Sequence, residues 1–182
     1  IKLNRIQLPE VEAILTNKCS LNDLQTNGDS EFEAAKHIQS FLQKQVDTYG
    51  KCTMVGFNSN NFDLPFLRTT LIRYGLNPYF RGGLQNLDIL HYVQLLAFEN
   101  PETYPWTLRN NDEGHPYYSF KLEDTAKAFE ILDGAQTHDA LEDVKLTINL
   151  VSKLDETFNS NLSEFIPFNL HRAPEKIGRA HV

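Results

Sequence analysis

The apolar residues between Asp139 and Leu154 repeat at helical spacing. Four of them are separated by three or four positions: Leu141, Val144, Ile148 and Val151. This spacing places them on one face of a helix, which predicts packing against the rest of the fold. Asp139 precedes Glu142 by three residues, as in a capping box, so we expect the helix to begin after Asp139 and to run to about Leu154.

A second helix is predicted from Ser30 to about Val46. Ser30 precedes Glu33 in the same capping pattern. The apolar positions that follow also have helical spacing. They are Phe32, Ala35, Ile38, Phe41 and Leu42. We expect this face to contact the core.

The stretch from Cys52 to Phe57 is short, apolar and rich in β-formers, and the polar cluster 58–61 follows it. This pattern predicts a buried strand that leads into a loop. Phe62 and Asp63 close the loop, and a helix is then expected from Leu64, because Pro65 is tolerated in a first turn. Its apolar side is predicted to comprise Phe66, Leu67, Leu71 and Ile72. Asp63 is therefore expected at a strand-loop-helix junction, where open α/β sheets place their sites.

The middle of the chain predicts one more strand, two helices and a long loop. Residues 87–90 have strand character and lead into a predicted helix at 92–97. Residues 100–118 form a long polar stretch with the single tryptophan, and loops of this length often have a function. The next helix is expected to begin at Ser119.

Composition bounds the class of protein. With 182 residues, 41% hydrophobic and 23% charged, the chain suits one globular domain. Cys19 and Cys52 lie far apart and match no zinc or disulfide pattern, so we expect a reducing cytoplasm. No apolar run has transmembrane length, so no membrane partner is expected.

The net charge of −7 opposes a nucleic-acid partner, because phosphates attract Lys and Arg. This objection weakens if some of the acids hold metal ions that approach the phosphates. A His and an Asp at a helix entry, His138 and Asp143, can supply a general base and a metal ligand. Taken alone, His138 and Asp143 are more typical of a solvated first turn that complements the helix dipole, and Asp63 is more typical of an N-cap.

The order of the motifs decides between these interpretations. Residues 58–63 resemble the second motif of the DEDDh exonuclease superfamily, and residues 138–143 resemble its third. The segments between them narrow the resemblance to the bacterial exonuclease I family. These are Arg73-Tyr74, Asn77-Pro78-Tyr79, residues 87–90, and Asn111 to Gly114 with Pro116 and residues 119–122. The resemblance extends from Leu8-Pro9 to about Leu170.

This resemblance implies an α/β, RNase H-like fold, a mixed sheet flanked by helices. It implies 3′→5′ degradation of single-stranded DNA by two-metal phosphodiester hydrolysis, with two Mg²⁺ ions, or Mn²⁺ in their place. Asp63 and Asp143 would be metal ligands and His138 the general base. Other positions would contact the substrate: Asn58, Phe62, Ser119 and Lys121. The implied partners are single-stranded DNA and, through parts of the protein outside this chain, single-strand DNA-binding protein.

The family's first motif, an Asp-x-Glu on the first strand, has no counterpart on a predicted strand before Cys52. Glu10-x-Glu12 lacks the Asp. We therefore expect residues 1–176 to be an exonuclease domain without its first strands, and to be inactive alone. Residues 177–182 could be encoded by the start of a common sequencing adapter, so we expect a non-native tail.

Two alternatives remain open at this point. One is another DEDDh exonuclease, either a proofreading subunit or an RNA-trimming enzyme. The other is a nucleic-acid-binding module that has lost catalysis, against which the retained His138 and Asp143 argue. The leading hypothesis predicts that Asp63 and Asp143 converge on one cleft bordered by His138, and that the strand 52–57 has an unpaired edge with apolar residues in solvent.

Overall fold

The computed structural model describes residues 1–2, 10–11, 14–15, 20–79, 83–134 and 140–165. The chain divides into two compact units, and each is described by itself. The first comprises Ile1–Leu87 with Ala135–Lys145, and the second comprises Asp88–Gly134 with Leu146–Val182.

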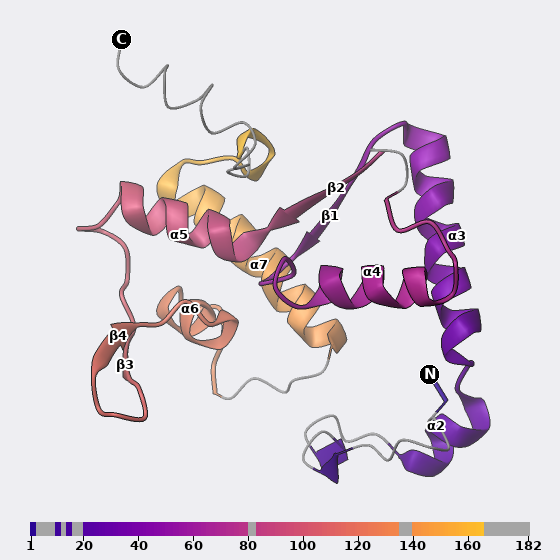
Figure 1. Ribbon diagram of the computed structural model, residues 1–182. Coiled ribbons are helices and arrows are strands. Elements are labelled where there is room, and N and C mark those ends of the chain that lie inside the picture. The colour runs from indigo at the N-terminus through magenta and orange to yellow at the C-terminus, as the bar shows by residue number, and fades with distance from the viewer. Residues whose placement is uncertain (3–9, 12–13, 16–19, 80–82, 135–139, 166–182) are drawn as a thin grey trace. The chain divides into compact units, whose positions relative to one another are not determined.

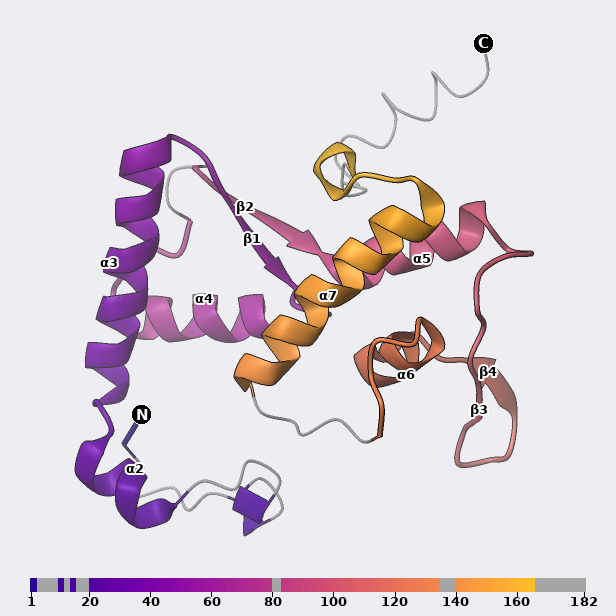
Figure 2. The same ribbon diagram turned by 180° about the vertical axis from the view of Figure 1, so that it is seen from behind.

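The first unit is built around a β-α-β arrangement. Strand β1 (Cys52–Gly56) leads through helix α4 (Asp63–Arg73) to strand β2 (Leu84–Asp88). β1 and β2 pair in a two-stranded sheet, and their arrows run in the same direction in both views (Figures 1 and 2). A crossover helix is what a parallel pair requires, because a tight turn cannot connect parallel strands. The predicted strand and the helix after Asp63 are confirmed.

Helix α3 (Glu31–Tyr49) follows the short helix α2 (Leu21–Asn27). Its start is the predicted capping box: the Glu33 N–H donates to Ser30 Oγ at 3.2 Å, and the Ser30 N–H donates to Glu33 Oε2 at 3.1 Å. Gly50, at φ 74°, ends the helix in a backbone conformation that favours glycine. The sequence therefore determines both ends of α3 locally.

The core of the first unit forms where α3 meets α4. Its buried residues are Ala35, Leu42 and Leu71, packed against partly buried neighbours. An ion pair strengthens this junction: Arg73 Nη1 lies 2.9 Å from Glu31 Oε1, and the Tyr74 hydroxyl donates to Glu31 Oε2 at 2.7 Å. The hydrogen bond to Glu31 raises the pKa of Tyr74.

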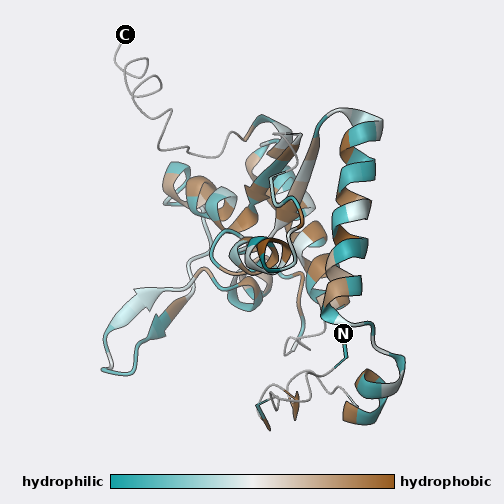
Figure 3. Ribbon diagram, turned by 45° about the vertical axis from the view of Figure 1, so that its right-hand side comes forward, coloured by the Kyte–Doolittle hydropathy of each residue, from teal (hydrophilic) through white to brown (hydrophobic). Residues whose placement is uncertain are grey.

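Part of the predicted apolar faces is wrong. Apolar and polar positions alternate along α3 (Figure 3), and three residues expected in its core face are exposed. These are Phe32 (44%), Ile38 (43%) and Phe41 (62%). On α4, Phe66 and Ile72 are likewise exposed, whereas Leu71 is buried as predicted and Leu64 is buried as well. Both helices carry more apolar residues than one neighbour can cover, so periodicity alone did not identify the packed face.

The predicted open edge of β1 fits what the structure describes. Within the described ranges, β1 pairs with β2 alone, and Val55 is 52% exposed. The side chains of β1 alternate between half-buried and exposed positions. One face of the strand therefore packs on the unit and the other meets solvent.

The second unit begins with helix α5 (Ile89–Glu99). The predicted strand 87–90 is therefore shifted, because Asp88 ends β2 and caps α5: the Leu90 N–H donates to Asp88 Oδ1 at 3.1 Å. A capping Asp favours the helix over continued strand. The predicted loop 100–118 holds a hairpin of β3 (Leu108–Asn110) and β4 (Pro116–Tyr118), and α6 spans Leu122–Ala128, so it begins three residues after Ser119.

Helix α7 (Ala140–Phe158) continues four residues beyond the predicted end at Leu154, and its predicted cap Asp139 lies outside the described residues. The buried positions of α7 are Leu146, Thr147, Leu150 and Leu154. Three residues of the stripe expected in the core are exposed, Leu141 (62%), Val144 (55%) and Ile148 (60%), and the fourth, Val151, is half-buried. That prediction is wrong because α7 has a second apolar series, and this series is the one that packs.

Helices α5 and α7 are joined by a partly buried polar contact. The Tyr92 hydroxyl donates to Asp155 Oδ1 at 2.5 Å and lies 2.7 Å from Ser160 Oγ. Burial, supported by the bond to Asp155, raises the pKa of Tyr92 to about 12. Aromatic rings surround Tyr104, among them Phe129 at 5.6 Å between centroids. Burial raises the pKa of Tyr104 to about 12.

Among the described residues, no helix has the length and apolarity to cross a bilayer.

Candidate metal and nucleic-acid site

The loop between β1 and α4 carries two of the predicted site residues, Asn58 and Phe62, and leads to a third, Asp63. Asn58 has a positive φ of 58°, and its side-chain oxygen accepts a hydrogen bond from the Asn61 amide at 2.9 Å. The Ser59 carbonyl accepts from the Leu64 N–H at 2.9 Å, which joins the loop to the first turn of α4. The Asn86 amide donates to Asn60 Oδ1 at 2.7 Å, which joins it to β2. These bonds fix where α4 begins.

Asp63 is the first residue of α4 and is exposed. Phe62 occupies the N-cap position without a side-chain bond to the helix, and its ring is 70% exposed. The capping explanation for Asp63 is therefore not observed, although a carboxylate in the first turn still complements the helix dipole. Within the described part of the chain, the Asp63 side chain has no hydrogen bond or ion pair. Its carboxylate oxygens are thus open to a ligand.

Asp143 is the fourth residue of α7 and is half-buried. It belongs to the same compact unit as Asp63. His138 lies outside the described residues. The convergence of Asp63, Asp143 and His138 on one cleft therefore stays a prediction. In the described ranges, no three His, Cys, Asp or Glu side chains are grouped as for a metal ion.

The first 51 residues contain one Asp-x-Glu sequence, Asp29-Ser30-Glu31. It lies at the start of α3, where Ser30 is the N-cap and Glu31 is bound by Arg73 and Tyr74. This Asp-x-Glu sequence therefore lies at the start of a helix and not on a strand. Glu31 stabilises the α3-α4 junction.

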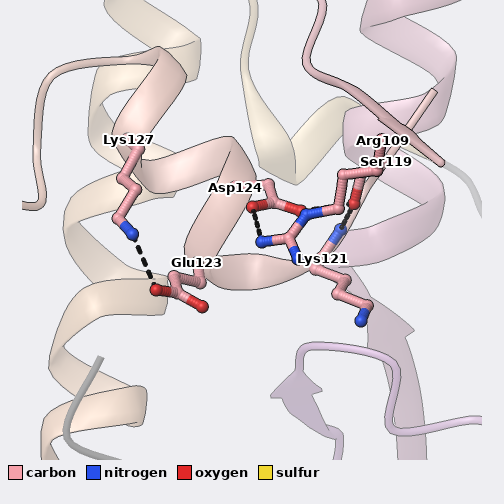
Figure 4. Close-up of polar contacts among 6 residues, drawn as sticks. All are labelled: Arg109, Ser119, Lys121, Glu123, Asp124 and Lys127. Carbon is pink, nitrogen blue, oxygen red and sulfur yellow. Dashed lines mark hydrogen bonds and ion pairs between the residues drawn. The ribbon is translucent and has the colours of Figure 1, made fainter. Parts of the chain in front are cut away.

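Ser119 and Lys121, predicted to bind substrate, belong to the second unit and lie just before the start of α6 (Figure 4). Ser119 is buried: its hydroxyl donates to Asp124 Oδ2 at 2.5 Å, and its N–H donates to the Thr107 carbonyl at 2.9 Å. Lys121 is exposed and is the N-cap residue of α6. Contact of either residue with substrate stays a prediction.

Asp124 is the residue around which this cluster is organised, and sequence reasoning missed it. Arg109 Nη2 on β3 lies 2.5 Å from Asp124 Oδ1, so one carboxylate binds both the hairpin and Ser119 (Figure 4). Burial acts to raise the pKa of Asp124, but the hydrogen bonds from Arg109 and Ser119 outweigh it and hold the pKa below its usual value. The sequence signal for Asp124 was an acid in the first turn of a helix. Such acids are too common in helices to identify one residue as important.

The donor chemistry of the predicted metal ligands suits a hard divalent cation. Asp63 and Asp143 offer carboxylate oxygens, which Mg²⁺ and Mn²⁺ prefer over nitrogen or sulfur. The exposure of Asp63 leaves its oxygens accessible to such an ion. Two carboxylates alone hold Mg²⁺ weakly, because the ion otherwise completes its shell with water and substrate phosphates.

Comparison with known proteins finds similarity to exonucleases. No family model matches the chain. It is 28% identical over 169 residues to exodeoxyribonuclease I of Buchnera aphidicola subsp. Baizongia pistaciae, covering 91% of this chain and 33% of that protein. The structure of E. coli exonuclease I with a 5cy-dT13 oligonucleotide matches with a TM-score of 0.63 and 28% identity, over 83% of this chain and 30% of that one. An exonuclease I complex with the SSB C-terminus matches with a TM-score of 0.62 and 26% identity, over 86% and 32%.

The predicted α/β, RNase H-like fold is therefore confirmed by similarity to solved exonucleases I. The curated relatives that it matches are exodeoxyribonucleases I, so the resemblance noted in its motifs is confirmed. The chain spans about a third of the length of these relatives.

Proposed function

We propose that this chain is part of a 3′→5′ exonuclease that degrades single-stranded DNA by two-metal phosphodiester hydrolysis and acts in DNA repair in the cytoplasm. The observation that supports this proposal is the combined similarity in sequence and fold to exonucleases I, over 83% or more of the chain. One of those exonucleases was solved with an oligonucleotide. The motifs at 58–63 and 138–143 supply the residue types that the reaction needs.

The roles of the residues follow from their chemistry. Asp63 and Asp143 would hold the divalent cations, Mg²⁺ or Mn²⁺, through carboxylate oxygens. Bound cations of this kind activate a water and stabilise the leaving 3′ oxygen. His138 takes the proton of the attacking water as general base, since an imidazole titrates near neutral pH.

Four other residues would position the strand. The Phe62 ring is exposed next to Asp63, so a base can stack on it beside the scissile phosphate. Asn58 offers an amide on the same loop. Lys121 is an exposed cation for the phosphate backbone, and Ser119 holds the segment that carries it. An exonuclease I complex with the SSB C-terminus suggests single-strand DNA-binding protein as a second partner.

Metal binding is tested on the 182-residue chain with Mn²⁺, whose paramagnetism reports binding directly. We expect weak binding that Asp63→Asn and Asp143→Asn each reduce further. Asp112→Asn is the matched control, because Asp112 is an exposed acid in the hairpin of the second unit. Equal Mn²⁺ binding by all four proteins would refute the assignment of the ligands.

Activity is tested on the longest natural form of the protein that carries this sequence. A 5′-labelled single strand should shorten from its 3′ end only when Mg²⁺ is present. His138→Ala should lower the rate constant about 10²–10⁴-fold while DNA affinity changes little, because a general base acts in the transition state. Turnover equal to the parent would remove His138 from the mechanism, and the absence of any 3′ shortening by the parent would refute the proposed function.

A further inference from the structure

The segment from Ser119 to Asp124 carries an exposed lysine between two buried polar residues. Ser119 is 5% exposed and Asp124 is 4% exposed, whereas Lys121 lies open to solvent between them. The Lys121 side chain extends away from Asp124 (Figure 4), and within the described ranges its ammonium has no ion pair. Lys121 therefore presents its charge where the phosphate of a ligand can reach it.

Lys121 is the N-cap residue of α6, but its side chain makes no capping bond. Its backbone is fixed by neighbours instead: the Lys121 N–H donates to Ser119 Oγ at 3.4 Å, and its carbonyl accepts from the Thr125 N–H at 2.9 Å. Asp124 is the third residue of α6, the position from which the acid of a capping box bonds back to the N-cap N–H. Here the Ser119 hydroxyl lies between the two groups, because it accepts from Lys121 and donates to Asp124. The Asp124 carboxylate thus fixes Lys121 through Ser119.

The other oxygen of Asp124 connects the same segment to the hairpin. Asp124 Oδ1 lies 2.5 Å from Arg109 Nη2 on β3, and the Ser119 N–H donates to the Thr107 carbonyl at 2.9 Å. The segment that carries Lys121 is therefore held by both α6 and the hairpin. Neither Asp124 nor Arg109 has a role in the function proposed above.

We propose that Asp124 is a positioning residue for DNA binding: through Ser119 it fixes the backbone of Lys121, and the lysine so fixed binds a phosphate of the strand. The inference rests on the proposed function, which supplies the strand and its contact with Lys121. It predicts an effect opposite to that of charge alone. Removal of a carboxylate near the strand should tighten binding by simple electrostatics, whereas loss of the position of Lys121 should weaken it.

Strand affinity is measured on the longest natural form of the protein that carries this sequence, with a fluorescent single-stranded oligothymidylate and no divalent metal, so that no hydrolysis occurs. We expect Lys121→Gln to weaken binding about threefold to tenfold and to reduce the salt dependence of the affinity by about 0.7 in logarithmic slope, as the loss of one phosphate contact does. Asp124→Asn should weaken binding about threefold and reduce the slope in the same direction. Ser119→Ala should do the same without any change of charge.

A double-variant cycle tests whether Asp124 acts through Lys121. In a chain that already carries Lys121→Gln, Asp124→Asn should change the affinity by less than about twofold, because the contact that Asp124 positions is already absent. With Mg²⁺ present, Asp124→Asn should raise KM about threefold and leave kcat within about twofold, because a binding contact acts on the ground state and the transition state alike.

Two control variants separate positioning from charge and from stability. Glu123→Gln removes an acid adjacent to Asp124 in the sequence, whose Oε1 lies 2.7 Å from Lys127 Nζ, and should not weaken binding. Leu150→Ala removes a fully buried side chain of α7 and should bind the strand as the parent does at temperatures where it is folded.

The outcomes distinguish the positioning role from the proposed function. Parental affinity for Lys121→Gln, parental or tighter binding by Asp124→Asn, or losses that multiply fully in the double variant would each overturn the positioning role. An equal loss in Leu150→Ala would also overturn it. A parent that binds the strand with the expected dependence on Asp124 and Lys121 but never shortens it with Mg²⁺ keeps the positioning role and refutes the exonuclease. A parent that does not bind the strand refutes both.

Discussion

A β-carbon built on Gly56 would lie 2.8 Å from the β-carbon of Ser59, closer than such atoms approach in folded proteins. Gly56 is the last residue of β1, and Ser59 is buried in the loop that leads to Asp63. The absence of a side chain at Gly56 thus allows the loop to fold back over the strand end. The position of Asp63 depends on this contact, because the Ser59 carbonyl binds the first turn of α4.

Gly56→Ala should therefore destabilise the chain by about 1–3 kcal/mol, the usual cost of overpacking. Urea unfolding measures the change, with Thr53→Ala on an exposed position of β1 as the control. Ser59→Gly removes the atom that the new methyl group would meet. The double variant Gly56→Ala with Ser59→Gly should then lose less stability than the sum of the two single variants. If the stability losses of the two single variants simply added up in the double variant, the two residues would not clash.

The exposed and buried series of α7 give a direct test of which face packs. Leu150 is fully buried, whereas Ile148 is 60% exposed. We expect Leu150→Ala to lower the free energy of unfolding by about 2–5 kcal/mol and Ile148→Ala to change it by less than about 0.5 kcal/mol. If both variants lost the same free energy of unfolding, Ile148 would have to be packed in the core.

Local signals in the sequence predicted the elements of this fold better than their packed faces. The Ser30 capping box, the strand from Cys52 and the helix after Asp63 depend on residues adjacent in the chain, and all three were predicted. The packed face of α7 depends on which neighbour covers it. Because α7 carries two apolar series, its sequence is compatible with either orientation.

In the candidate site, too, local features were predicted from the sequence, and features that depend on distant residues were not. The place of Asp63 at a strand-loop-helix junction follows from local pattern, and the structure agrees. The cluster of Arg109, Ser119 and Asp124 could not be predicted, because it depends on a hairpin of two three-residue strands inside an apparent loop. Strands this short have no periodicity to recognise.

Asp124 should confer stability that depends on pH in a predictable direction. Its carboxyl has a pKa below the usual value in the folded chain, so it binds protons more weakly there than when unfolded. Its contribution is therefore present above the unfolded pKa of about 3.9 and is lost as pH falls through the folded pKa. Asp124→Asn replaces one accepting oxygen by an amide that faces the donors Arg109 and Ser119. We expect a loss of about 1.5–3 kcal/mol at neutral pH.

Urea unfolding at a series of pH values below 6 measures this contribution. The difference between the parent and Asp124→Asn should shrink as the pH falls below about 4. Asp112→Asn, at an exposed position of the hairpin, should match the parent throughout. A difference that stayed constant down to the lowest pH would mean that the charge of Asp124 is not what stabilises the cluster.

Tyr92 should confer stability that is lost as the pH rises, whereas the contribution of Asp124 is lost as the pH falls. Its pKa is about 12 in the folded chain and about 10 in an unfolded one, so the folded state holds this proton more tightly. The stabilisation is fully present below pH 10 and is lost as the pH rises from about 10 through 12. Tyr92→Phe removes the hydroxyl that bonds to Asp155 and Ser160, and we expect it to cost about 1.5–3 kcal/mol at neutral pH. Tyr104, whose pKa is also about 12, is retained in both proteins. Between pH 10 and 12, the parent should therefore lose more stability than Tyr92→Phe, and parallel losses would show that the Tyr92 hydroxyl ionises at its ordinary pH.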